Sequence, residues 1–161
     1  MKRMIRITVS IMVLAVTALL AIPLLTRWVE KLSPMPDNLG VQNGQLAPCP
    51  DTPNCVSTYE NDEEHGIEKI PFEGTAEEAQ ARILTAIGQM ERTTLITNEP
   101  GYIHVELRSP TMNFIDDAEF YFGEGVDGIQ FRAAARLGYD DMNMNRKNME
   151  KFRRLFTALA E

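Results

Sequence analysis

Three consecutive segments alternate apolar and polar residues with a period of two, and this pattern constrains the fold most. The segments span residues 102–109, 117–122 and 129–136, and a glycine-rich hairpin turn at 123–128 joins the last two. Alternation of this kind predicts strands with one buried face and one polar face. We therefore expect an antiparallel sheet whose apolar face must be covered by other elements.

Two amphipathic segments are expected to supply that cover as helices. The first begins at Thr75, which is predicted to form a capping box with Glu78. The second spans residues 146–160, and Asn143 or Asn145 is its expected cap. The sequence therefore predicts an α+β fold, a two-layer sandwich in which an antiparallel β-sheet carries two helices on one face.

The N-terminal segment has no charge from 7 to 25, and Lys2, Arg3 and Arg6 precede it. These 19 residues approach the roughly 20 that a helix needs to cross a bilayer. We interpret residues 1–27 as a transmembrane signal anchor, with a cleaved signal peptide as the alternative. The positive-inside rule then places this single-pass anchor in the inner membrane and the C-terminal domain in the periplasm.

The rest of the chain is expected to be one linker and one domain. Residues 28–47 are rich in Pro, Gly and Asn without a period, which predicts a linker. Residues 48–161 are enough for a single stable core, with further short strands expected at 66–72 and 92–97. The net charge of −7 argues against a nucleic-acid partner.

Cys49 and Cys55 are the only cysteines, and Pro50 and Pro53 stiffen the short loop between them. An exported domain meets oxidising conditions, so we expect a disulfide that clips this loop locally. A redox-active dithiol is a weaker interpretation, because reactive pairs favour a Cys-x-x-Cys spacing. Two cysteines and two distant histidines also make a poor zinc site.

Three segments carry a family resemblance. "CPDTPNCVS", "RSPTMNFIDDAEFYF" and "RAAARLGYDDMNMNRKNMEKFR", spread over about residues 47–158, resemble the bacterial and plastid domain of unknown function 1499 family. Two serines of the family pattern are Ala133 and Ala135 here, which excludes a serine nucleophile at these positions. The resemblance implies a small exported or membrane-tethered domain and assigns no activity.

The polar face of the predicted sheet is the candidate binding site. If neighbouring strands pair with their apolar faces together, Arg108 is expected opposite Asp117, and Glu119 opposite Arg132. The face can be a solvated array of cross-strand ion pairs, or its arginines can grip an anion bidentately. Its candidate residues are His104, Glu106, Arg108, Asp117, Glu119, Arg132 and Arg136.

Asp116 has the parity of the core residues, and a lone buried carboxylate is costly. We expect it at a strand end, with Arg146 as a candidate partner. The loop that contains Asp140 and Asn145 would then be a structural latch between sheet and helix. A metal site is the less favoured interpretation of these residues, because their spacing matches no known cation loop.

These features favour a binding or interaction module anchored to the lipid membrane by its N-terminal helix. Its ligand would be an anionic small molecule, a lipid headgroup or an envelope protein. No metal or other cofactor is expected. The alternative is a hydrolase that uses His104, Glu106 or Glu119 as its base, which would require a concave pocket around these residues.

Overall fold

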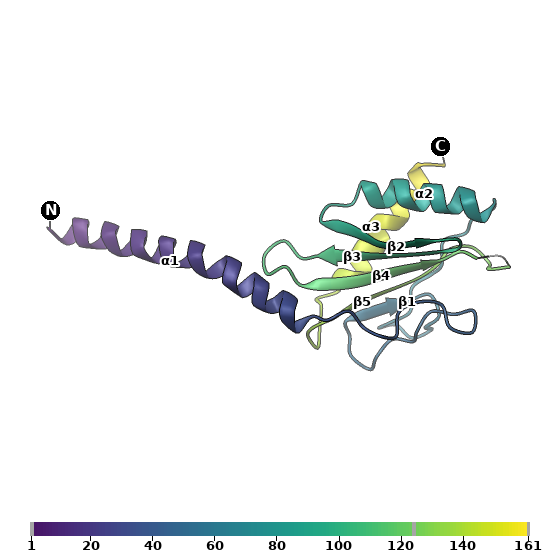
Figure 1. Ribbon diagram of the computed structural model, residues 1–161, viewed down its shortest axis with the longest axis horizontal. Coiled ribbons are helices and arrows are strands. Elements are labelled where there is room, and N and C mark those ends of the chain that lie inside the picture. Colours follow the sequence, from purple (N-terminus) through teal and green to yellow (C-terminus); the bar gives the residue numbers. More distant parts are fainter. Residues whose placement is uncertain (1, 124, 161) are drawn as a thin grey trace.

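The computed structural model describes residues 2–123 and 125–160, without the side chains of residues 2, 15, 18 and 19. A long helix, α1 (Lys2–Leu32), projects from a folded domain that begins where the helix ends (Figure 1). Residue 124, inside the turn predicted at 123–128, lies outside the described residues.

The domain is built on a five-stranded antiparallel sheet in the order β1-β5-β4-β3-β2. The helices α2 and α3 cover one face of this sheet (Figure 1), which confirms the predicted α+β fold. The strands are β1 (Cys55–Ser57), β2 (Thr93–Glu99), β3 (Tyr102–Arg108), β4 (Ile115–Tyr121) and β5 (Gln130–Ala135). The helices are α2 (Ala76–Gly88) and α3 (Met144–Ala158).

The core lies between the sheet and these two helices. The alternating apolar residues of β3, β4 and β5 point toward α2 and α3, as their period of two requires. Phe152 of α3 packs on Phe120 of β4, with ring centroids 4.4 Å apart. The opposite face of the sheet carries the polar residues, so the strand parity derived from the sequence is correct.

Of the two helix caps predicted from the sequence, the cap of α2 makes the expected hydrogen bonds and the cap of α3 does not. The capping box of α2 is confirmed, because the Glu78 amide donates to Thr75 Oγ1 at 3.2 Å and the Thr75 amide donates to Glu78 Oε2 at 2.8 Å. At α3 the cap position is Asn143, but its side chain makes no capping bond. The Asn145 amide donates instead to Asp141 Oδ2 at 2.6 Å.

Of the two further short strands predicted, the one at 92–97 is confirmed as β2, and the one at 66–72 is wrong. No strand forms at 66–72 within the described residues, where Ile70 makes only an isolated bridge to Ile129. The unpredicted strand β1 pairs with the edge of β5. A three-residue strand has too few alternating positions to show a period, so only its tertiary partner reveals it.

The predicted disulfide between Cys49 and Cys55 is present. It joins the start of the domain to the first residue of β1, across a sequence separation of 6 residues. The Cys49 amide also donates to Glu60 Oε1 at 3.1 Å. The bond is therefore a local clip that fixes how the chain enters the edge of the sheet.

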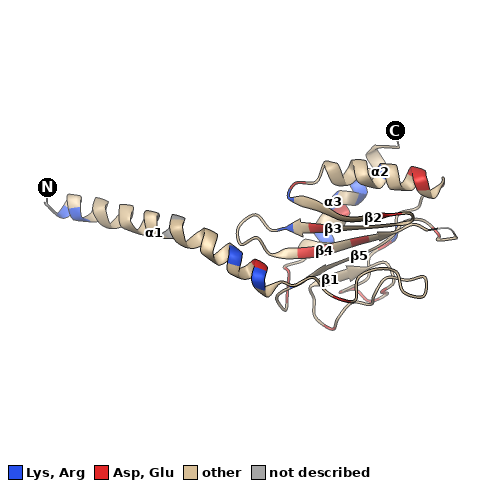
Figure 2. Cartoon of the chain, in the orientation of Figure 1, with Lys and Arg blue, Asp and Glu red and all other residues tan. Residues whose placement is uncertain are grey.

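The helix α1 contains the segment from 7 to 25 that we predicted to cross a membrane. Over the described residues, no helix is both long enough and apolar enough for such a crossing. The structure confirms that this segment is helical. Lys and Arg lie at the two ends of α1 and not between them (Figure 2).

Candidate functional site: an ionic network beneath the linker

The polar face of the sheet brings the predicted binding residues together. β3, β4 and β5 are adjacent, and their side chains on this face project away from α2 and α3. Charged residues therefore line the middle of the sheet (Figure 2). The residues that we call the polar face are His104, Glu106, Arg108, Asp117, Glu119, Arg132 and Arg136.

One of the two predicted cross-strand pairs is correct. Glu119 lies opposite Arg132. Asp117 lies opposite Glu106, whereas Arg108 lies opposite Ile115, so the predicted Arg108–Asp117 pair is wrong. A period of two fixes the face of a residue but leaves pairings two residues apart equally compatible with it.

Asp117 is the centre of the network. Arg136 donates from Nε to Asp117 Oδ2 and from Nη2 to Asp117 Oδ1, both at 2.7 Å. His104 Nε2 lies 2.7 Å from the same Oδ1. Burial alone would raise the pKa of Asp117, but the bonds from Arg136 and His104 outweigh burial and hold this pKa below 3.8. Asp117 is therefore a buried, paired carboxylate.

Glu106 extends the network toward α1. Its Oε1 accepts from Arg136 Nη2 at 2.7 Å, and its Oε2 accepts from Arg108 Nη2 at 2.9 Å. Arg108 Nη2 also lies 3.2 Å from Oε1 of Glu30, a residue of α1 whose side chain is 54% exposed. The network therefore begins at a buried carboxylate and ends at a carboxylate in contact with solvent.

Glu119 anchors the other end of the polar face. It accepts from the Tyr102 hydroxyl at 2.8 Å and from the Gly40 amide at 2.7 Å, while Arg132 Nη1 lies 3.4 Å from Oε2. Burial and the Glu119 carboxylate both raise the pKa of Tyr102, so this hydroxyl remains a donor. Arg132 Nε is buried and has no partner among the described residues.

The segment predicted as a linker, residues 28–47, covers this face. Ser33 and Leu46 are buried, and the Ser33 carbonyl accepts from Arg136 Nη1 at 3.3 Å. The Gly40 amide binds Glu119 from the same segment. The interpretation of the polar face as a solvated array is therefore wrong, because its carboxylates and His104 are almost fully buried.

Two of the four predicted latch residues, Asn145 and Arg146, bind neighbouring loops. Asn145 Nδ2 donates to the Asn54 carbonyl at 3.0 Å, and Asn54 Nδ2 donates to the Gly138 carbonyl at 2.7 Å. Arg146 binds the carbonyls of Gly66 and Glu64 at 2.9 and 3.0 Å. Asn54 thereby ties the disulfide loop to the loop before α3.

The expected pairing of Asp116 with Arg146 does not occur. Asp116 is 8% exposed and forms no salt bridge within the described residues. Burial, together with the nearby charges of Asp141 and Asp117, raises its pKa from 3.8 to about 7. Asp140, another predicted latch residue, accepts from the Met142 amide at 2.6 Å, which is a contact within its own loop.

Four residues of the site were not among the predicted candidates, and only one of them, Tyr102, gave a usable signal in the sequence. Tyr102 shares the parity of His104, so its place on the polar face was open to prediction. Glu30, Ser33 and Gly40 belong to α1 and the linker, and two of them contribute only main-chain groups. A main-chain donor or acceptor exists at nearly every residue, so no pattern of side chains can point to it.

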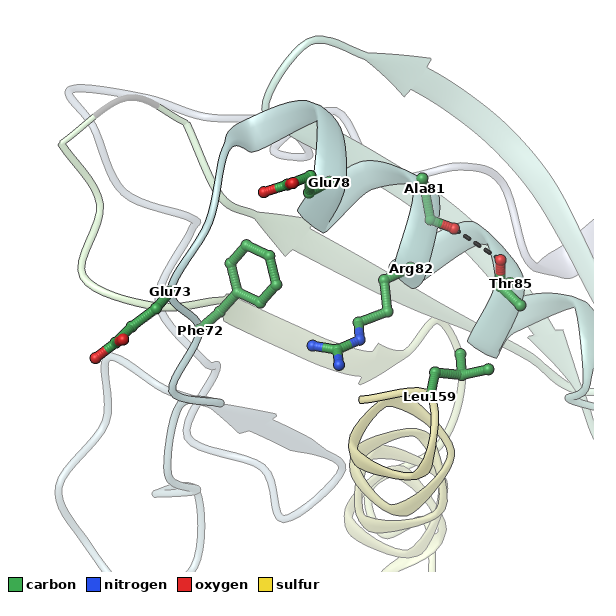
Figure 3. A pocket seen from close by; sticks show the side chains of 7 residues that line it. All are labelled: Phe72, Glu73, Glu78, Ala81, Arg82, Thr85 and Leu159. Carbon is green, nitrogen blue, oxygen red and sulfur yellow. Dashed lines mark hydrogen bonds between the residues drawn. The ribbon is translucent and has the colours of Figure 1, made fainter. Parts of the chain in front are cut away.

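A separate hollow of about 520 Å³ lies between α2 and the C-terminal end of α3 (Figure 3). Arg82 projects into it and stacks over the rings of Phe156 and Phe72, at 4.7 and 5.7 Å from their centroids. Glu78 lines it as well but is held in the capping box of α2. Arg82 and Glu78 thus have structural contacts, and no predicted site residue lies there.

The chemistry of the polar face is that of a closed, paired network. Two of its carboxylates share the guanidinium of Arg136, and its histidine faces a carboxylate. In residues 2–123 and 125–160, no three His, Cys, Asp or Glu side chains form a group able to hold a metal ion. The point of contact with solvent is Arg108, whose second carboxylate partner is Glu30.

Comparison with known proteins places the chain in a family. The family model described as "Protein of unknown function (DUF1499)" matches residues 45–156. The chain belongs to the DUF1499 family. The match begins near Leu46, the buried residue at the end of the linker, and ends in α3, so it spans all five strands and the disulfide. No curated protein and no solved structure matches this DUF1499 chain.

Proposed function

We propose that this DUF1499 protein is a membrane-anchored binding module of the cell envelope, with its domain on the periplasmic side of the inner membrane. The observation that carries the proposal is α1. Its described apolar side chains are exposed on all sides of the helix, from Met4 to Leu25. A helix that is apolar all round needs a protein core or a lipid bilayer around it.

The charges at the two ends of α1 support the same proposal. Arg3 and Arg6 precede the uncharged stretch, and Arg27 and Lys31 follow it. Basic side chains at both ends can reach the lipid headgroups while the stretch between them contacts acyl chains. The disulfide supports export, because such bonds persist mainly in oxidising compartments.

Anchoring and export can be tested together on the full chain in its own membranes. We expect the protein to resist extraction at alkaline pH, and Cys49 and Cys55 to react with a thiol reagent only after reduction. Replacing both cysteines with serine should lower the free energy of unfolding by about 2 kcal/mol, as expected for a short closed loop. Alkaline release of the protein contradicts the anchor, and labelling without reductant contradicts export.

The binding part of the proposal rests on the contact between Arg108 and Glu30. An ion pair with a half-exposed partner contributes only about 0–1 kcal/mol, so a competing anion can displace Glu30. Arg108 would keep its bond to Glu106, and its guanidinium, released from Glu30, would bind a carboxylate or phosphate group. The ligand is then an anionic small molecule, a lipid headgroup or an acidic segment of an envelope protein.

Native mass spectrometry of the full chain, released from its own membrane in mild detergent without reductant, tests this site. We expect a stoichiometric additional mass that is lost in Arg108→Ala and retained in Arg154→Ala, a matched change at an exposed arginine of α3. An additional mass that survives Arg108→Ala contradicts this binding site, and a bare monomer contradicts stable binding.

The hydrolase alternative has no comparable support. A general base must reach a water molecule and a substrate, yet His104 is 2% exposed and Glu119 is 0% exposed. Glu106 is 7% exposed, and Arg136 and Arg108 already bind its two carboxylate oxygens. The geometry therefore favours binding over catalysis on this face.

A further inference from the structure

Two loops emerge from the end of the domain at which α1 enters. The loop 109–114 joins β3 to β4, and the loop 136–143 joins β5 to α3. Because β4 is antiparallel to both of its neighbours, the two loops leave the sheet at the same end. The Arg136 amide donates to the Ile115 carbonyl at 3.0 Å, which confirms that the bases of the two loops adjoin.

These loops expose apolar side chains that the core does not use. Tyr139 is 72% exposed, Met142 is 79% exposed and Phe114 is 40% exposed. Met144, at the start of α3, adds a further exposed apolar side chain next to them in sequence. We call Phe114, Tyr139, Met142 and Met144 the loop surface.

The backbone holds part of this surface outward. Met142 has a φ of 57°, in the left-handed region that side chains other than Asn and Asp rarely adopt. Its amide is bound by Asp140 Oδ1 at 2.6 Å, and Lys147 Nζ binds its carbonyl at 2.9 Å. A constrained backbone that presents an apolar side chain to solvent suggests that the side chain has a partner outside the domain.

The position of α1 identifies that partner. Glu30 follows Leu25 by five residues, so its contact with Arg108 lies roughly 7–8 Å along the helix from the end of the uncharged stretch. The headgroup region of one leaflet is itself about 5–8 Å thick. Arg108 is the last residue of β3, and the loop after it extends toward α1 (Figure 1).

We propose that the loop surface contacts the lipid bilayer, so that the domain lies on the membrane into which α1 is inserted. This inference rests on the proposed anchoring of α1 and adds a second membrane contact to it. Phe and Tyr side chains are suited to the boundary between headgroups and acyl chains, and Met adapts its shape to a disordered apolar surface. Lys151 and Arg92, close to the base of these loops, lie near the same headgroups.

The experiment uses the single tryptophan of the chain, Trp28. The full-length protein is reconstituted into vesicles of phosphatidylcholine and phosphatidylglycerol, with and without bromine on the acyl chains, which quenches nearby tryptophan. Two reporters carry Trp28→Phe together with Phe114→Trp or Met142→Trp. A matched control carries Trp28→Phe and Val126→Trp, because Val126 lies in the turn between β4 and β5 at the opposite end of the sheet. Circular dichroism checks that each variant is folded.

We expect brominated lipid to reduce the fluorescence of both loop reporters to about half or less, and to leave that of the Val126→Trp control nearly unchanged. Quenching of wild-type Trp28 without quenching of the loop reporters would overturn the loop contact and leave the anchor intact. If wild-type Trp28 is also not quenched, α1 is not in the bilayer and the proposed anchoring fails as well. Loop reporters that are unquenched and crosslink to a second copy of the chain would assign the surface to dimerisation instead.

Discussion

Arg136→Ala is expected to lower the free energy of unfolding by about 3–5 kcal/mol, which is the largest effect of any single change that we anticipate. The Arg136 guanidinium makes two bonds to Asp117 and one to Glu106, and its side chain is almost fully buried. Without it, two carboxylates remain buried with less positive charge to compensate them. Urea unfolding of the oxidised full chain in detergent, followed by circular dichroism, measures the change.

Two further variants separate the role of this side chain from a general effect of losing an arginine. Arg136→Lys keeps the charge but loses the planar fork, so it should recover only part of the lost stability. Arg154→Ala removes an exposed arginine of α3 and should change stability by no more than about 0.5 kcal/mol. If Arg136→Ala fails to fold, Arg136→Lys still provides the measurement. A loss below about 1 kcal/mol in Arg136→Ala would show that Asp117 and Glu106 do not depend on this counter-charge.

Asp116→Asn is expected to stabilise the protein above neutral pH, by about 4 kcal/mol at pH 8. Burial raises the pKa of Asp116 from 3.8 to about 7, so the folded state binds this proton more tightly than the unfolded state. Stability therefore falls as the pH rises from 3.8 to about 7, and the loss is complete above that range. An uncharged amide of similar size removes the cost of burying the charge.

The neighbouring residue supplies the control with the opposite sign. The pKa of Asp117 is held below 3.8, so its charged form contributes stability above that pH and loses it as the pH falls. Asp117→Asn should therefore destabilise the protein at pH 8, where Asp116→Asn stabilises it. Urea unfolding of the wild type and both variants at pH 8 measures these opposite changes, and a series across pH 4–8 measures the slope due to Asp116, because Asp117 titrates below that range. If Asp116→Asn and the wild type respond to pH in the same way, Asp116 is not the buried acid that the structure indicates.

Part of this site was accessible to prediction because strands have a strict period. Alternation placed His104, Asp117 and Glu119 on one face and Phe120 on the other, and the sheet confirms this division. It also paired Glu119 with Arg132 correctly. The same reasoning paired Arg108 with Asp117 wrongly, because a shift by two residues keeps every side chain on its face.

The sequence alone determined the elements whose signals are local: the capping box of Thr75 and Glu78, the alternation of the strands and the bond between Cys49 and Cys55. The tertiary fold is needed to show that the segment after α1 covers the polar face and makes it a buried network. Gly40 reaches Glu119 across 79 residues of sequence through a main-chain amide. Such a contact has neither a period nor a distinctive side chain in the sequence. It can be recognised only in the folded protein, where the sheet brings the acceptor to this amide.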